Sequence, residues 1–258
     1  MSHESRSPLI LTALEGIPMI QEGDDLVEII LCALEDNHVK LIDGDVLVIT
    51  QKIVSKAEGQ KIDLGTVVPS REAQNLAEKT VKDPRVVELI LQESNKVLRS
   101  RPGLIIVEHR RGFVCANAGI DRSNVTGKDS DFVLLLPENP DKSALDLRQK
   151  LEAAADVQLG VVINDSHGRA WRNGTVGISI GFSGLPGIVD LRGEPDLFDY
   201  QLRITQIAAV DELAAGASLL MGQAAEGLPV VHVRGFPYPL RDGSFQEIPR
   251  EHSNDLFR

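Results

Sequence analysis

The stretch 161-VVINDSHGRAWRNGTVGISIGFSGLPGIVDLRG-193 brings together the end of an apolar run and a cluster of polar and charged side chains. It continues an apolar run, residues 160–163, that predicts a buried strand. A carboxylate, a hydroxyl, an imidazole and a guanidinium follow within residues 164–169, at the predicted end of that strand. Active-site groups of α/β proteins often lie at such ends. The residue types fit equally well a glycine-rich hairpin whose charged turn faces solvent.

Glycines recur through the rest of this stretch as far as Gly193, and the only tryptophan, Trp171, lies between Arg169 and Arg172. Glycine lets a backbone approach another element closely or bend tightly. We expect the glycines here to serve one of these two purposes.

The composition limits the class of protein. A chain of 258 residues can bury a large core, as one domain or as two intimately packed ones. Acidic residues outnumber basic ones by 38 to 27, for a net charge of −11. This balance argues against non-specific binding of nucleic acid and against docking on an anionic membrane. A local cluster of lysines and arginines, or a metal ion, still permits an anionic substrate.

The two cysteines, Cys32 and Cys115, fit neither a metal-binding spacing nor a disulfide framework. We therefore expect a reduced, cytoplasmic environment and two cysteines that act as small buried hydrophobes. The N-terminal apolar segment is too short for a signal peptide. No run approaches the roughly 18 apolar residues of a membrane span.

The apolar patterns predict an α/β protein. Strands are expected at residues 9–14, 46–49, 104–108, 112–116, 132–136, 160–163 and 228–233. Helices are expected after an N-cap at Asp24, over 70–100 with a break at Asp83-Pro84, over 142–156 and over 199–221. We expect residues 1–236 to form the functional domain and residues 237–258, rich in proline and charge, to form a loosely packed tail.

Several familiar catalytic motifs are missing from the sequence: the phosphate loop GxxxxGK[ST], GxGxxG after a first strand, HExxH, zinc spacings and the GxSxG elbow. The remaining candidates for a site are side chains that offer oxygen ligands. They are Asp121, Asp165, Ser166 and Gln223, which follow three separate predicted elements. Such hard ligands suit Mg²⁺ or Mn²⁺, with substrate phosphates completing the shell. The residue types alone favour the simpler interpretation that the two aspartates cap helices or turns.

Five motifs, in this order along the chain, resemble the coenzyme F420-0:L-glutamate ligase family. They are GIPMIQEGDDL (16–26), DGDVLVITQKIVSKAEG (43–59), CANAGIDRSN (115–124), VVINDSHGRAWRNGTVGISIGFSG (161–184) and LLMGQAAEG (219–227). The resemblance extends from about Leu11 to Arg234. It implies an enzyme that adds γ-linked glutamate to a deazaflavin redox coenzyme in coenzyme F420 biosynthesis.

The resemblance also implies cofactors, partners and a fold. Members of this family use GTP as co-substrate, two divalent ions (Mg²⁺ or Mn²⁺) and a stimulating K⁺. Their fold is α/β of the α+β type with mixed sheets, unlike the P-loop and Rossmann folds. They form an intertwined homodimer with the nucleotide site near the subunit interface. The implied substrates are GTP, L-glutamate and coenzyme F420-0.

The resemblance assigns metal binding to Asp121, Asp165, Ser166 and Gln223. Ser166 stands where a threonine is common and keeps the hydroxyl ligand. Gln223 stands where a glutamate is common, so the loss of charge predicts weaker binding of the second metal ion. Glu226 is a nearby substitute.

Catalysis is expected of Asp121 and Asp165, together with Arg169 and Arg172. We expect these arginines and His167 to hold acidic groups of the substrates, because arginine matches carboxylate and phosphate; a structural salt-bridge role fits them equally. The nucleotide contacts that the resemblance implies are Ile17, Pro18, Met19, Ile20, Gln51, Lys52, Lys56, Asn124, Met221, Gly222, Gln223, Ala224, Ala225, Glu226, Gly227 and Leu228. Taken alone, the two lysines are more often solvated surface residues.

Three other functions stay open at this point. The first is a γ-glutamyl ligase that acts on another acceptor such as folate. The second is a non-catalytic regulator that binds GTP and metal. The third is a metal-dependent phosphohydrolase, which would release phosphate without glutamate.

Overall fold

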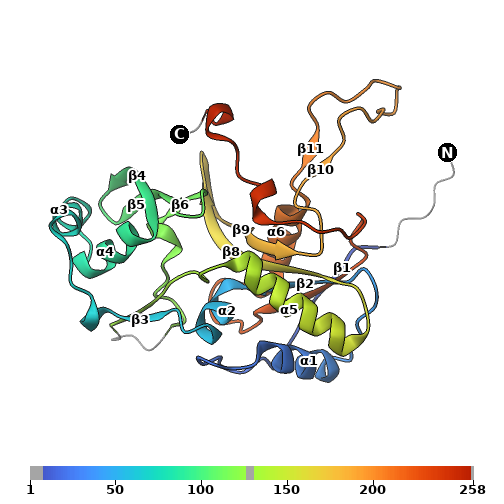
Figure 1. Cartoon of the computed structure of the whole chain (residues 1–258), viewed down its shortest axis with the longest axis horizontal. Coiled ribbons are helices and arrows are strands. Elements are labelled where there is room, and N and C mark those ends of the chain that lie inside the picture. Colours follow the sequence, from blue (N-terminus) through green and yellow to red (C-terminus); the bar gives the residue numbers. More distant parts are fainter. Residues whose placement is uncertain (1–7, 126–130, 257–258) are drawn as a thin grey trace.

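The computed structural model describes residues 8–125 and 131–256, and its body is built on a five-stranded sheet in the order β1-β12-β2-β8-β9 (Figure 1). Its strands are β1 (Ile10–Ala13), β2 (Val46–Thr50), β8 (Gly160–Arg169), β9 (Arg172–Ser183) and β12 (Val230–Arg234). β2 and β8 are parallel, whereas the other neighbouring pairs are antiparallel. The expected α/β class with mixed sheets is therefore confirmed.

Helices cover both faces of this sheet (Figure 1). They are α1 (Leu26–Asp36), α2 (Gln51–Ala57), α5 (Pro140–Ala155) and α6 (Ala209–Met221). Leu47 and Ile49 of β2 pack in the core shared with α1, α2 and α5, whereas Val46 and Val48 pack in the core shared with α6. The continuous apolar run of β2 is thus that of a strand buried on both faces.

A smaller unit lies beside the main sheet and has its own apolar core around Ile90, Ile105 and Val107. Its elements are α3 (Arg71–Thr80), α4 (Pro84–Gln92), β4 (Ser94–Arg101), β5 (Leu104–His109) and β6 (Val114–Ala116). A short antiparallel pair, β3 (Lys61–Asp63) and β7 (Phe132–Leu134), joins this unit to the body. The helix break predicted at Asp83-Pro84 is confirmed, with Asp83 capping α4.

Four local predictions were wrong. Residues 94–101 form strand β4 because they pair with β5, a long-range partner that overrides the helical pattern. Residues 199–208 precede α6 and are not helical, so this helix begins only at Ala209. Asp25 rather than Asp24 caps α1, because its carboxylate accepts hydrogen bonds from the first-turn N–H groups. Cys32 is exposed, and Cys115 alone is buried.

The sequence predicted that the strand beginning at residue 160 ends before residue 164. In the structure, β8 continues to Arg169 in a hairpin with β9. Its neighbour on the other side does stop: β2 ends at Thr50, opposite Asn164, and the chain continues as α2. Among the described strands, β8 therefore pairs from Asp165 onward with β9 alone. This change opens space beside Asp165 and Ser166 at the edge of the sheet.

Two glycines of the 161–193 stretch allow close backbone packing, which is one of the uses expected of them. A Cβ at Gly177 would lie 2.5 Å from the carbonyl oxygen of Ala214 on α6. A Cβ at Gly181 would meet the backbone of Pro140 at the start of α5. β9 thus lies tightly between the helices of the two faces, and any larger residue at these positions forces the helices outward.

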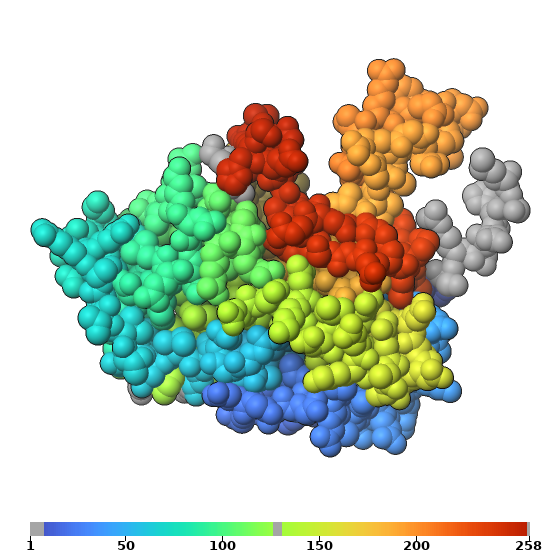
Figure 2. All heavy atoms as spheres, viewed as in Figure 1, coloured from blue at the N-terminus to red at the C-terminus, as the bar shows by residue number. Residues whose placement is uncertain are grey.

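An arm projects from the body between β10 (Val189–Asp190) and β11 (Gln206–Ile207), and it stands clear of the rest of the molecule (Figure 2). Its outer part carries the large apolar side chains Leu197, Phe198 and Ile204, each of which is almost fully exposed. Apolar side chains of this size are rarely so exposed together on a monomer without a binding partner.

Part of the C-terminal tail packs on the body, in contrast to the loose packing expected of it. Phe245 is buried, and its N–H donates to the carboxylate of Asp141 on α5. Glu247 accepts hydrogen bonds from the N–H groups of Gly187 and Ile188 and from Arg241. Within the described residues, we found no helix of the length and apolarity needed to cross a membrane.

Candidate functional site

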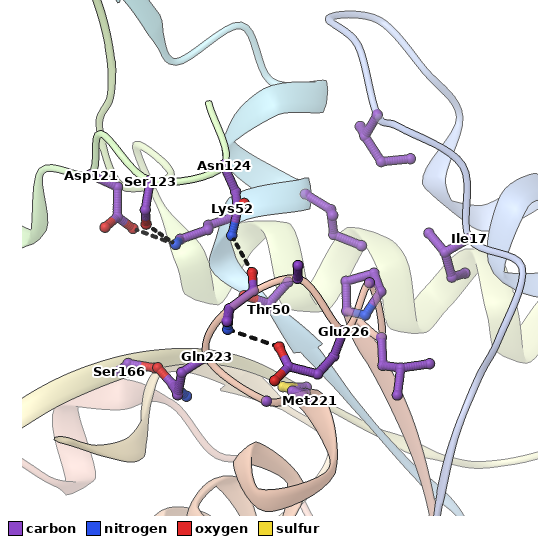
Figure 3. A pocket seen from close by; sticks show the side chains of 18 of the residues that line it. Ile17, Thr50, Lys52, Asp121, Ser123, Asn124, Ser166, Met221, Gln223 and Glu226 are labelled. Atoms are coloured by element: carbon purple, nitrogen blue, oxygen red, sulfur yellow. Dashed lines mark hydrogen bonds and ion pairs between the residues drawn. The ribbon is translucent and has the colours of Figure 1, made fainter. Parts of the chain in front are cut away.

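A cavity of about 570 Å³ lies at the edge of the sheet where β2 ends and β8 continues alone (Figure 3). Six chain segments line it: the loop around residues 17–20, the junction of β2 and α2, residues 121–124, the middle of β8, Thr175 on β9, and residues 221–229. Each segment belongs to one of the five motifs or directly adjoins it. Motifs far apart in the sequence therefore meet at one place.

The residues that the resemblance pointed to line this cavity with few exceptions. Those brought together are Ile17, Pro18, Met19, Ile20, Lys52, Lys56, Asp121, Asn124, Asp165, Ser166, Met221, Gly222, Gln223, Ala224, Ala225, Glu226, Gly227 and Leu228. The sequence reasoning missed Thr50, Ile53, Ser123, Thr175 and Pro229, which also line it. Their position inside or next to the five motifs was the available signal.

Asp121 is held in place from two sides. Its backbone bridges to Leu134 through a pair of 2.9 Å hydrogen bonds. Its Oδ2 accepts a 2.9 Å hydrogen bond from Gln51 Nε2 and lies 3.5 Å from Lys52 Nζ. Burial and the negative charge of Asp165 raise the pKa of this carboxyl, while Lys52 opposes the shift. Two carboxylates thus share the cavity and repel one another.

Asp165 is almost completely buried and is paired with a histidine on its own strand. His167 Nε2 lies 2.9 Å from Asp165 Oδ2. Burial alone would raise the pKa of Asp165, but the hydrogen bond and charge of His167, with a backbone N–H from Ser166, hold it below its ordinary value. Asp165 is therefore ionised at neutral pH and adds negative charge to the cavity.

Two lysines of α2 provide the positive charge. Lys52 Nζ donates a 2.8 Å hydrogen bond to Ser123 Oγ and is also close to Asp121 (Figure 3). Partial burial, with the positive charges of Lys52 and Lys61, lowers the pKa of Lys56. A group of lysines that repel one another favours an anionic ligand, because an anion relieves the repulsion.

The loop after α6 closes the cavity. Asn124 Nδ2 donates to the carbonyl of Ala224, and the N–H of Ala224 donates to the Glu226 carboxylate (Figure 3). Ser166 Oγ donates to Gln223 Oε1 over 2.8 Å. These bonds connect the loop to residues 121–124 and to β8, so three motifs fix each other's positions around the cavity.

Four residues singled out by the sequence do not line the cavity. Gln51 is fully buried behind it and contacts Asp121. His167 is also buried, so we interpret it as a partner of Asp165 and not as an exposed group that grips substrates. Arg169 and Arg172 lie exposed at the tip of the β8–β9 hairpin, where Arg169 donates to the carbonyls of residues 173 and 174.

The donor set fits the divalent metal ions that the resemblance implies. Asp121 and Asp165 supply carboxylate oxygens, Ser166 a hydroxyl and Gln223 an amide oxygen, all at one cavity. In residues 8–125 and 131–256 no group of three or more His, Cys, Asp and Glu side chains has the geometry of a metal site. A metal held here would be bound by these two aspartates with Ser166 and Gln223, and oxygens of a bound substrate would complete its shell, as is common for Mg²⁺.

Fold and cavity together define a mixed α/β protein with a binding pocket lined by carboxylates and lysines. Comparison with known proteins agrees across almost the whole chain. The model of the family "F420-0:Gamma-glutamyl ligase" matches residues 16–235. The chain is 46% identical over 250 residues to a "Coenzyme F420:L-glutamate ligase" of Methanothermobacter thermautotrophicus, covering 96% of this chain and 98% of the relative.

Two further relatives carry the same name. The protein of Methanopyrus kandleri is 46% identical over 252 residues, which covers 95% of this chain and 97% of the relative. The protein of Methanococcus maripaludis is 43% identical over 244 residues, 94% of each chain. The chain therefore belongs to the F420-0:gamma-glutamyl ligase family, and the resemblance found in its sequence is confirmed.

Proposed function

We propose that this protein is a GTP-dependent ligase that adds L-glutamate, through γ-linkage, to coenzyme F420-0. The observation that carries the proposal is the meeting of all five family motifs at one cavity with two aspartates and two lysines. The names of the relatives supply the acceptor and the amino acid. The net negative charge of the chain does not exclude an anionic substrate, because Lys52 and Lys56 supply positive charge at the cavity itself.

The chemistry explains why the reaction needs a nucleotide. A carboxylate is a poor acyl donor because its oxygen is a poor leaving group. Transfer of the γ-phosphate of GTP to the acceptor's carboxylate forms an acyl phosphate and GDP. The amine of glutamate then attacks the carbonyl carbon, the C–O bond to phosphate breaks, and inorganic phosphate leaves with the electron pair.

The residues of the cavity can bring these anionic reactants together. Lys52 and Lys56 would attract the triphosphate and offset the repulsion between its charges and the acceptor. Asp121, Asp165, Ser166 and Gln223 would hold the Mg²⁺ or Mn²⁺ ions. When bound, such ions neutralise charge on the transferred phosphoryl group. We assign no residues to the K⁺ ion that the resemblance implies.

We also propose that the protein is a homodimer and that the arm between β10 and β11 takes part in the dimer. The support is the arm's exposed apolar outer part, with Leu197, Phe198 and Ile204 facing solvent in the single chain. Burying these side chains against a second copy would remove apolar surface from water, which favours association. A Leu197→Asp variant should shift the molecular mass measured by light scattering toward that of the monomer.

The test of the activity is incubation of the purified protein with coenzyme F420-0, L-glutamate, GTP and Mn²⁺, followed by mass spectrometry. We expect products longer by one or more glutamyl units and GDP in matching amounts. Lengthening of folate instead would identify the other ligase. GDP release without glutamate would indicate a phosphohydrolase, and GTP binding without turnover would indicate a regulator.

A further inference from the structure

Gln51 lies behind the cavity and has a fixed orientation. Its side chain is fully buried, at 0% exposure. Ser55 Oγ donates to Gln51 Oε1 over 2.9 Å, so the amide oxygen is already used and Nε2 points to Asp121 Oδ2, 2.9 Å away. A carboxylate can only accept hydrogen bonds, so this orientation of the amide satisfies both partners.

His167 is fixed in a similar way beside the second aspartate. It stands two residues after Asp165, and alternate residues of a strand point to the same face. Its Nε2 lies 2.9 Å from Asp165 Oδ2, and both residues are buried. The ring of Phe113 packs at 5.5 Å from the imidazole, and Phe113 in turn stacks on His109. The imidazole therefore has little freedom to rotate away.

We infer that Gln51 and His167 are positioning residues that orient the carboxylates of Asp121 and Asp165 toward a ligand in the cavity. Each contacts one oxygen, Oδ2, of a cavity-lining aspartate, while neither lines the cavity itself. The inference rests on the proposed function, in which these carboxylates bind divalent metal ions. Partners that hold a ligating group in this way typically change metal affinity by about 10- to 100-fold when removed.

Asp121 has more constraints than Asp165, so Gln51 and His167 should affect metal binding to different extents. Asp121 also has Lys52 near its Oδ2 and a backbone bridge to β7, so it keeps other constraints if Gln51 is changed. Asp165 is more deeply buried and has His167 as its side-chain hydrogen-bond partner. We therefore expect removal of the His167 donor to weaken metal binding more than removal of the Gln51 donor.

The first test measures binding of Mn²⁺ alone, without nucleotide, by electron paramagnetic resonance of the free ion. His167→Phe keeps an aromatic ring against Phe113 but removes the donor, and it should weaken Mn²⁺ binding by about 10- to 100-fold. His167→Gln places an amide nitrogen near the position of Nε2 and should restore most of the affinity. Gln51→Met keeps the buried volume and should weaken binding by about 10-fold.

The protein offers a matched control in a second buried histidine–aspartate pair. His232 Nε2 lies 2.8 Å from Asp45 Oδ2, and both residues are buried, but neither lines the cavity. His232→Phe should lower the melting temperature without changing the affinity for Mn²⁺. Ser55→Ala removes only the bond that orients Gln51, so its effect should be smaller than that of Gln51→Met.

The inference is overturned if folded His167→Phe binds Mn²⁺ as tightly as the wild type, if His167→Gln does not restore affinity, or if the wild type binds no Mn²⁺. Failure of the proposed function looks different. In that case the wild type would bind Mn²⁺, the two donor-deleted variants would bind it more weakly, and coenzyme F420-0 would not be lengthened by any of them.

Discussion

The two halves of strand β8 differ in their neighbouring strands and in the type of side chain that they carry. Residues 160–163 lie between β2 and β9, and Val161, Val162 and Ile163 are completely buried by helices on both faces. Residues 165–169 lie beyond the end of β2 and carry mostly polar side chains, whose positions depend on hydrogen bonds such as that of Ser166 to Gln223 and that between His167 and Asp165. The first half is held by apolar packing that tolerates similar residues, whereas the second depends on individual hydrogen bonds.

This difference explains the position of the cavity. A strand that leaves its neighbour exposes one edge, and the chain after β2 turns away as α2 with Gln51, Lys52 and Lys56 on it. Asp165 and Ser166 are the first residues of β8 beyond that point. The buried apolar residues 160–163 therefore fix the position of the polar residues that follow, and Asp165 has little freedom to move. Substitutions in the two halves should thus affect different measured quantities.

The largest effect is expected from Asp165→Asn, which keeps the shape of the side chain but removes its charge. Loss of a group that stabilises transferred charge commonly costs about 3–4 kcal/mol in the activation barrier. We expect kcat for γ-glutamyl product to fall by roughly 10²–10³-fold, with a melting temperature close to that of the wild type. A normal rate would contradict the role of this residue.

Gly177→Ala should disturb the contact between the polar half of the hairpin and α6. The added Cβ would overlap with the Ala214 carbonyl and with Ser218. Overpacking of this kind costs about 1–3 kcal/mol of unfolding free energy. Chemical denaturation measures the loss, and Gly168→Ala is the control, because a Cβ at residue 168 meets nothing within 4 Å. Equal losses in both variants would contradict the tight packing.

Ile163→Val probes the apolar half. Removing one buried methylene should lower the free energy of unfolding by about 1 kcal/mol. Activity per folded molecule should stay within about twofold of the wild type, which is a change in barrier well below about 1.4 kcal/mol. The reason is that no polar contact of the cavity changes. A large loss of kcat with normal stability would show that the two halves are not separable.

The smallest effect concerns the free energy of unfolding at acidic pH, and it depends on Asp45, which directly precedes β2. Burial would raise the pKa of Asp45, but hydrogen bonds from Arg234 and the nearby His232 imidazole bring it below its ordinary value of 3.8. The lowered native pKa stabilises the fold above pH 3.8, and this contribution is lost as the pH falls through the native pKa. Unfolding free energy should therefore fall below about pH 4. Arg234→Gln should show a weaker dependence, and an unchanged slope would contradict this cause.

Much of the apolar framework could be predicted from the sequence, because local patterns determine it. The runs at residues 46–49 and 160–163 gave the two parallel strands, and Asp83-Pro84 gave a helix start. Residues 94–101 and 199–208 were assigned wrongly because their structure depends on long-range strand pairing and on the arm, which no local pattern encodes.

The candidate site was predictable only to the level of its motifs. Asp121, Asp165 and the loop after α6 were found through the family resemblance, and the structure brings them to one cavity. The partners of the two aspartates were not predictable. Gln51 was expected to contact nucleotide and His167 to contact substrate, whereas both are buried behind the carboxylates. The direction in which a polar side chain points depends on neighbours that are distant in the sequence.

We expect Asp121 and Asp165, which come from separate elements, to act as one site for phosphoryl transfer. The most direct test compares kcat for GTP-dependent lengthening of coenzyme F420-0 in Asp121→Asn, Asp165→Asn and the double variant. Groups that act as a unit show strongly non-additive losses. We predict that the double variant loses little more activity than either single one. Independent, additive losses, or single variants with wild-type rates, would contradict the claim.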